Sequence, residues 1–160
     1  MIGALVILIG ALCLSACEDT PPVVQPIQFS HKAHTEKGLA CDWCHQSVQK
    51  ASFAGIPNTE TCMMCHQGAI TDSPEEEKVR QYAEKGLPIP WRRLYEVPGH
   101  AYFSHRRHVT VGGIECVRCH GAIGDSTAPL ARAAVRMGMD VCVDCHTKRQ
   151  VNTDCNACHR

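Results

Sequence analysis

Aromatic side chains are scarce in this 160-residue sequence: Phe, Tyr and Trp together make up only 5% of the chain. Because these large rings contribute much of a protein core, a chain of this length would struggle to bury enough apolar surface with its own side chains. Net charge is also absent, since 16 basic residues balance 16 acidic ones. That balance gives no support for binding to nucleic acid or to a strongly charged membrane.

Cysteine and histidine, by contrast, are abundant, with 12 and 10 residues respectively. Disulfides, zinc and haem are the usual substitutes for an apolar core, and the spacing of the cysteines distinguishes them. The pattern Cys-x-x-Cys-His occurs five times and uses every cysteine except Cys13 and Cys17. The five motifs are Cys41, Cys44 and His45; Cys62, Cys65 and His66; Cys116, Cys119 and His120; Cys142, Cys145 and His146; and Cys155, Cys158 and His159.

The spacing within this motif suits covalent haem. On a helical turn, residues i and i+3 face the same side, so two thiols can form thioethers with the two vinyl groups of one porphyrin, and the next histidine supplies an axial nitrogen to iron. Zinc sites or five disulfides would leave the adjoining histidines unexplained, and thioredoxin-like chemistry needs one motif on a βαβ scaffold. The sequence therefore predicts five covalently bound haems c as the core of a fold that is mostly coil with short α-helices.

Five histidines outside the motifs match the five irons, which predicts two histidine ligands on each iron. Pairs of them stand three residues apart, so each pair projects from one side of a turn and can serve two neighbouring haems. The solitary histidine competes with a methionine, Met139, because a thioether is also a known axial haem ligand. The five histidines are His31, His34, His100, His105 and His108.

Residues 1–17 are expected to be a targeting segment. The run from Ile2 to Ala16 is almost entirely apolar or small, but it is shorter than the span of about 20 residues that a transmembrane helix needs. It suits a signal-peptide core. The tetrapeptide Leu14-Ser15-Ala16-Cys17 resembles a bacterial lipobox, in which Cys17 is lipidated, while an uncleaved short anchor is the alternative. Either way, the chain is expected on the periplasmic side of a bacterial membrane, held there by its anchor.

The rest of the chain divides into a leader, two related modules and a connector. Residues 18–28 form a proline-containing leader, and 27–70 and 100–160 form a two-haem and a three-haem module, each containing Phe-Ser-His-x-x-His. Residues 71–99 form a helical connector and a proline-rich loop. In this connector, Ser73 and Glu76 predict a capping box and Gly86 a helix stop. The alanine-rich segment 129–137 predicts a second helix.

The arrangement Phe-x-His-x-x-His followed by Cys-x-x-Cys-His resembles the class III cytochrome c family, including its three-haem members. The resemblance implies that the first histidine of each pair ligates the haem of the motif that follows it. His31 would then serve Cys41–Cys44, and His105 would serve Cys116–Cys119. His34 and His108 would cross to other haems.

A closer resemblance is to the pentahaem cytochrome subunit of alternative complex III, a bacterial quinol-oxidising respiratory complex. It implies membership of a membrane complex with iron–sulfur or molybdopterin-type and multispan subunits, and it favours Met139 over His100 as the fifth distal ligand. We prefer Met139 on this ground, although the histidine count favours His100. A free-standing lipid-anchored electron carrier and a multihaem reductase are the alternative functions. The segments that carry the resemblance are Thr61-Cys62-Met63-Met64-Cys65-His66, 87–93, Tyr102-Phe103-Ser104-His105 and Met139-Asp140-Val141-Cys142.

Overall fold

The computed structural model describes residues 21–160, so the predicted signal peptide and the lipidation site at Cys17 lie outside the described residues. The described part contains short helices joined by long coil segments and no β-strand, as predicted. None of its helices has the length and apolar character needed to cross a membrane. The elements are α1 (His31–Thr35), α2 (Cys41–Cys44), α3 (Thr59–Met63), α4 (Pro74–Glu84), the π-helical turn η1 (Arg107–Val111), α5 (Val117–His120), the 3-10 turn η2 (Ile123–Asp125), α6 (Met139–Lys148) and α7 (Cys155–Cys158).

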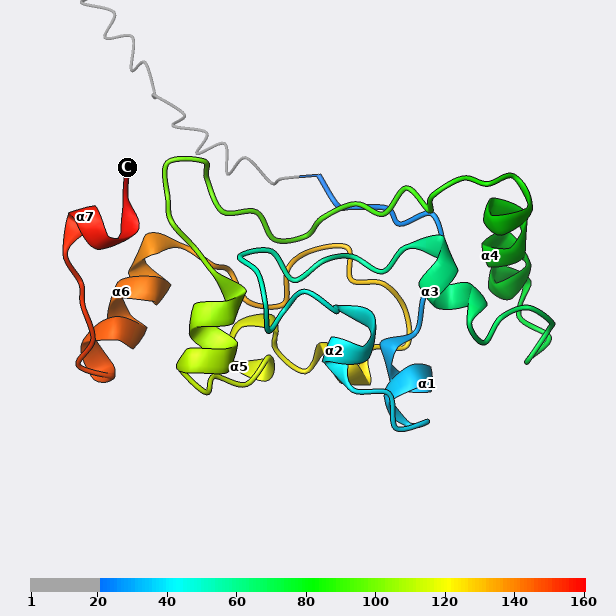
Figure 1. Ribbon diagram of the computed structural model, residues 1–160, viewed down its shortest axis with the longest axis horizontal. Helices are drawn as coiled ribbons and strands as arrows, with labels where there is room; N and C mark the ends of the chain where they lie inside the picture. Colours follow the sequence, from blue (N-terminus) through cyan, green and yellow to red (C-terminus); the bar gives the residue numbers. More distant parts are fainter. Residues whose placement is uncertain (1–20) are drawn as a thin grey trace, which may run out of the picture.

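These elements are arranged along the length of an elongated molecule, in an order that differs from their order in the chain (Figure 1). α4 and α3 occupy one end, α1 and α2 come next, and α6 and α7 occupy the other end near the C-terminus. After α4, residues 87–100 run back along most of the long axis. The leader is attached to this returning segment, because Gln25 donates to the carbonyl of Arg92 (2.7 Å) and accepts from the Arg92 N–H (3.0 Å). The chain therefore reaches both ends before the C-terminal motifs begin.

Gly86 ends α4, as predicted. Its φ of +62° lies in the left-handed region that glycine adopts without steric cost. The N–H of Gly86 donates to the carbonyl of Ala83 (3.0 Å), and the N–H of Leu87 donates to that of Tyr82 (2.9 Å). This pair of bonds is a Schellman motif, which satisfies carbonyls that the helix end would otherwise leave unpaired.

The start of α4 differs from the predicted capping box. Ser73 does cap the helix, because its side chain accepts from the N–H of Glu75 (3.3 Å). The Ser73 N–H, however, donates to the hydroxyl oxygen of Thr71 (3.2 Å) rather than to Glu76. The capping box is therefore wrong: Thr71 takes the donor that Glu76 was expected to satisfy, and the Glu76 carboxylate is free to bind elsewhere.

The predicted helix over residues 129–137 is also wrong, because this segment is coil. Its backbone makes contacts with distant parts of the chain instead of with itself. The carbonyl of Ala131 accepts from the N–H of Val23 (2.8 Å), and the N–H of Val135 donates to the hydroxyl of Tyr95 (3.4 Å). These tertiary bonds override the modest helical preference of alanine.

Side-chain packing forms only a small core. Among residues 21–160, four hydrophobic side chains are buried: Ile27, Val48, Val79 and Ile89. Val79 of α4 forms one cluster with Ile27 and Ile89. None of the described side chains is completely buried. A chain of this size normally buries about two thirds of the surface that it exposes when unfolded. Contacts between side chains therefore hold only part of this molecule together.

Candidate metal centres

Each Cys-x-x-Cys-His motif lies on a helical turn, as the spacing predicts. None of the ten motif cysteines forms a disulfide. In four motifs the N–H of the histidine donates to the carbonyl of the first cysteine, as His45 does to Cys41 (2.9 Å) and His159 to Cys155 (2.8 Å). In the remaining motif, Cys142, Cys145 and His146 lie within α6. The turn therefore fixes the histidine relative to the thiols that precede it.

Four motif histidines face a histidine from outside the motifs. A metal–imidazole bond is about 2 Å long, and the ring adds about 1 Å from nitrogen to centroid, so two imidazoles on opposite sides of one metal ion have centroids about 6 Å apart. The observed separations match this value within about half an ångström. The pairs are His34 and His66 (6.0 Å), His105 and His120 (6.3 Å), His108 and His146 (6.1 Å), and His100 and His159 (5.5 Å).

The fifth motif histidine, His45, lies near His31. Burial lowers the pKa of His31 first, and the positive charges that His45 and His34 can carry lower it further. Burial also lowers the pKa of His120, and the positive charges that His105 and His45 can carry lower it further. These effects favour the neutral imidazole, which is the form that binds a metal ion.

Hydrogen bonds orient five of these imidazoles. In each, Nδ1 lies within hydrogen-bond distance of a backbone carbonyl, which can only accept, so Nδ1 must carry the proton. The other ring nitrogen, Nε2, then keeps its lone pair for a metal ion. The bonds join His34 to Ser30 (2.8 Å), His45 to Gly55 (2.7 Å), His105 to Ser52 (2.8 Å), His108 to Ser104 (2.9 Å) and His146 to Asn152 (2.8 Å).

The phenylalanine of each Phe-Ser-His-x-x-His repeat packs against both of its histidines. Phe29 stacks on His34 with a centroid distance of 4.4 Å and meets His31 edge-on at 4.9 Å. Phe103 makes the equivalent contacts, at 4.8 Å, with the two histidines of the second repeat. The repeat therefore supplies two distal imidazoles together with the aromatic ring that holds them apart.

A pair of opposed imidazoles suits haem iron, whose porphyrin occupies the other four coordination positions. A structural zinc site needs four protein ligands. Across residues 21–160, no group of three or more His, Cys, Asp or Glu side chains converges in that way. The donor set that the chain presents therefore fits covalent haem c: each motif supplies two thiols and one imidazole, and in four motifs a second imidazole lies opposite the first.

His100 and Met139, the two candidates for the fifth distal position, lie in different surroundings. The ring of His100 is within 17° of parallel to that of His159. Its carbonyl accepts from the Arg160 N–H (3.0 Å), which ties this loop to the last motif. Met139 is the first residue of α6, and 69% of its surface is exposed. The contacts favour His100, although the ligand itself stays a prediction.

The five motifs form a row whose order differs from the order in the sequence. Burial raises the pKa of the Cys62 thiol, and the neighbouring Cys44 raises it further. Burial and then a neighbouring thiol likewise raise the pKa of three other cysteines. The neighbour is Cys41 for Cys116, Cys145 for Cys119, and Cys158 for Cys142, so the two thiols of each pair lie close together. The order is therefore Cys62–Cys65, Cys41–Cys44, Cys116–Cys119, Cys142–Cys145 and Cys155–Cys158, in agreement with the succession of helices in Figure 1.

Sequence reasoning missed one residue beside these centres, Glu76. Its carboxylate lies 3.7 Å from Nδ1 of His66 and accepts hydrogen bonds from the Thr71 hydroxyl (2.6 Å) and the N–H of Ile70 (2.8 Å). The bond from the Thr71 hydroxyl is the main reason why the pKa of Glu76 falls to about 2. An acidic residue in a first helical turn indicates capping, so the sequence offers no signal for this role.

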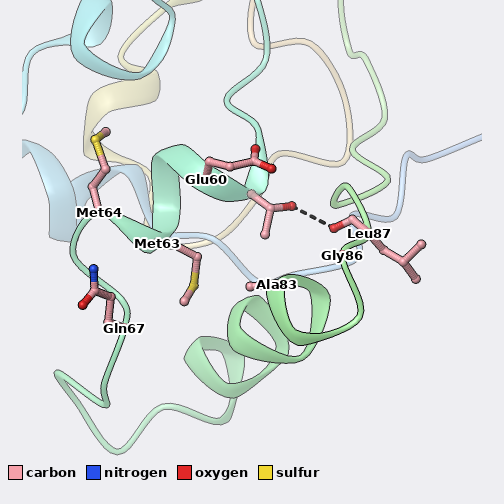
Figure 2. Close-up of a pocket in the computed structure, with 8 residues that line it drawn as sticks. Glu60, Met63, Met64, Gln67, Ala83, Gly86 and Leu87 are labelled. Atoms are coloured by element: carbon pink, nitrogen blue, oxygen red, sulfur yellow. Dashed lines mark hydrogen bonds between the residues drawn. The ribbon is translucent and has the colours of Figure 1, made fainter.

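A cavity of about 350 Å³ lies between α3 and α4 (Figure 2). Met63 and Met64 line it, whereas the adjacent Cys62 and Cys65 do not. On its wall, the Thr59 hydroxyl donates to the carbonyl of Leu87 (3.0 Å), the bond drawn in Figure 2. The cavity is thus separate from the paired histidines and marks the contact between the second motif and α4.

A family model and a curated protein both match this chain. The model of a family described as cytochrome c7 and related cytochrome c matches residues 27–84 and 101–160. The multiheme cytochrome c subunit of menaquinone reductase from Nitratidesulfovibrio vulgaris (strain Hildenborough) is 38% identical over 98 residues. That alignment covers 60% of this chain and 45% of the relative, so the chain spans less than half the length of the curated relative that it matches.

Proposed function

Because the chain belongs to the family of cytochrome c7 and related cytochromes c, we propose that it holds five haems c and relays electrons as a subunit of a quinone-linked membrane complex. The observation that carries this proposal is the set of opposed histidine pairs, four of them with centroids 5.5–6.3 Å apart. Each pair includes the histidine of a different Cys-x-x-Cys-His motif. When bound, haem supplies one-electron chemistry at iron.

The ligand sets favour electron transfer over catalysis at iron. Each motif provides two thiols for covalent attachment and one histidine; a second histidine faces that histidine in four motifs, and His31 lies near it in the fifth. Two protein ligands on an iron leave no coordination position open for a substrate. A multihaem reductase would need an open position, and the chain offers a distal histidine for every motif. His100 completes the fifth set in this proposal.

Two short turns hold neighbouring centres together. His31 and His34 lie on one turn of α1, yet His34 faces His66 whereas His31 lies near His45. His105 and His108 likewise belong to adjacent pairs, those of His120 and His146. Each turn therefore fixes the spacing between two successive centres, which keeps the row continuous. Partners would exchange electrons at its two ends, the motifs at Cys62–Cys65 and Cys155–Cys158.

The quinone link is supported by two likenesses. The sequence resembles the pentahaem subunit of alternative complex III, which is part of a quinol-oxidising complex, and the relative is named as a subunit of menaquinone reductase. We propose the quinol-oxidising direction, with the chain anchored through Cys17 on the periplasmic side of the membrane. Iron–sulfur or molybdopterin-type subunits and multispan subunits are the proposed partners. Quinone reduction, which the name of the relative favours, is the second candidate.

Affinity purification of the tagged, full-length chain from detergent-solubilised membranes tests this proposal. We expect iron–sulfur and multispan subunits to purify with it, and its haems to become reduced when menaquinol is added. Oxidation of the pre-reduced complex by menaquinone, without reduction by menaquinol, would favour the second candidate. A chain that purifies alone with its haems in place would instead be a free-standing, lipid-anchored carrier.

A further inference from the structure

His66 differs from two other motif histidines, His45 and His146, in what its Nδ1 faces. In His45 and His146 this atom donates to an uncharged backbone carbonyl. In His66 it is buried and makes no hydrogen bond within the described part of the chain, and the Glu76 carboxylate lies 3.7 Å away. Both side chains are largely buried, with 18% and 11% of their surfaces exposed. The Nδ1 atom of a motif histidine thus lies beside a buried carboxylate.

The charge of Glu76 is held in place by groups that stabilise the carboxylate. The Thr71 hydroxyl and the N–H groups of Ile70 and Thr71 donate to it at 2.6–3.3 Å. All of these donors are uncharged, so they orient the carboxylate without neutralising it. Hydrogen bonds of this kind favour the ionised form of a carboxyl group.

The nearest cation, Arg80, is mainly paired with a different carboxylate. Its Nε and Nη2 donate to Glu77 at 3.1 and 2.7 Å. Its Nη1 is 3.9 Å from Glu76, beyond hydrogen-bond distance, and is buried without a hydrogen-bond partner among residues 21–160. Arg80 therefore weakens the field of Glu76 at His66 without cancelling it.

We propose that Glu76 is a positioning residue for the axial ligand His66, and that its buried negative charge lowers the reduction potential of the Cys62–Cys65 centre. This inference rests on the proposed function, because it requires haem at that motif. A carboxylate facing the N–H of a metal-bound histidine fixes the ring and raises the basicity of the ligand. A more basic ligand and a nearby negative charge both stabilise the oxidised iron over the reduced iron.

The position of this centre determines how a lowered reduction potential affects electron transfer along the row. Cys62–Cys65 lies at one end of the row, beside α4, which carries Glu76. A lowered potential at a terminal centre favours the transfer of an electron from this centre to its neighbour.

The test is a redox titration of the five-haem protein. NMR of the hyperfine-shifted haem resonances monitors the titration, so that the potential of each haem is measured separately. In Glu76→Gln we expect the potential of one haem to rise while the other four stay near their wild-type values. In Arg80→Gln the potential of the same haem should fall, because a cation that partly offset Glu76 is removed. Glu84→Gln, the same charge change at an exposed position on α4, is the matched control.

Opposite shifts distinguish a charge effect from loosening of α4, which would move both variants in the same direction. Shifts of the same sign, or no shift in Glu76→Gln beyond that in Glu84→Gln, overturn the inference. If Glu76→Gln loses the haem at Cys62–Cys65, the direction of the shift in Arg80→Gln decides, and anything other than a fall overturns it. A wild-type protein without haem would instead refute the proposed function itself.

Discussion

The imidazole rings of His105 and His120 lie within 5° of parallel, with their centroids 6.3 Å apart. His105 is held from the first module, since the carbonyl of Ser52 accepts from both its backbone N–H (3.0 Å) and its Nδ1–H (2.8 Å). His120 is held by its own motif, through the bond from its N–H to the carbonyl of Cys116 (2.9 Å). Two separate parts of the chain therefore define one gap of the width that a metal ion needs.

We expect the purified chain to carry five haem masses, because each motif supplies two thiols for thioether bonds. The double variant Cys155→Ala and Cys158→Ala should carry four. Intact-protein mass spectrometry under denaturing conditions measures both, since covalent haem survives denaturation. Fewer than five masses in the fully matured wild type would contradict the count.

Replacing His100 should expose one iron, because its ring faces His159. We expect His100→Ala to show a high-spin signal from one of the five oxidised haems. Met139→Leu, a swap of similar volume at an exposed position, should leave all of them low-spin. Electron paramagnetic resonance and near-infrared magnetic circular dichroism make the measurement. A thioether band in the wild type that disappears in Met139→Leu would assign the fifth ligand to methionine.

Loss of the central motif should divide the row. In the double variant Cys116→Ala and Cys119→Ala, we expect electrons to equilibrate within two groups of two haems but only slowly between them. The double variant Cys155→Ala and Cys158→Ala removes an end and should leave the remaining four in rapid exchange. Flash photoreduction followed by absorption spectroscopy measures this equilibration. Equally fast exchange in both double variants would contradict the proposed order.

Thr59 should contribute to stability without affecting the irons. Its buried hydroxyl donates to the carbonyl of Leu87 (3.0 Å) and accepts from the N–H of Ile89 (3.2 Å). Thr59→Val keeps the shape but leaves both backbone groups unpaired, which should lower the free energy of unfolding by about 1–3 kcal/mol. Thr147→Val, at an exposed position, should change it by less than about 0.5 kcal/mol. Denaturant titration gives these values, and equal effects in the two variants would contradict the role of Thr59.

Glu75 should make stability sensitive to acid. Its hydrogen bond from Lys78, and then the one from the Gln28 N–H, lower its pKa below the ordinary value of 4.5. The folded state therefore binds this proton less tightly than the unfolded state, so the stabilisation is present above pH 4.5 and is lost as the pH falls through the lowered pKa. We expect Glu75→Gln to be less stable at neutral pH and to lose less stability on acidification, as measured by denaturant midpoints. An acid dependence as steep as that of Glu84→Gln would contradict this account.

The local features of the fold were predictable because short-range rules determine them. The spacing of each motif predicts a helical turn, and the structure confirms one at every motif. Gly86 was predictable as a helix stop because a left-handed residue there completes the bonding of the helix end. The ring of His105 lies opposite that of His120, but the ligand role that the family resemblance implies for His105 stays a prediction. The leader and module boundaries stay predictions.

The order of the motifs and the role of Glu76 were not predictable, because contacts between distant segments determine them. The returning segment after α4 is fixed by its bonds to Gln25, and segment 129–137 is coil whose Ala131 carbonyl bonds to the distant Val23. Glu76 belongs to a helix start in sequence, but Thr71 displaces it from that role and leaves its carboxylate beside His66. No local pattern encodes these three outcomes.

The scarcity of buried apolar side chains has a consequence for biogenesis. With four such side chains among residues 21–160, the polypeptide has little to fold around until its thiols have reacted. We therefore expect the attachment machinery to work on an extended chain, and the histidine-bearing turns to close afterwards, since ligand binding and folding are coupled. A cell that exports the chain without that machinery should degrade it rather than accumulate a stable precursor.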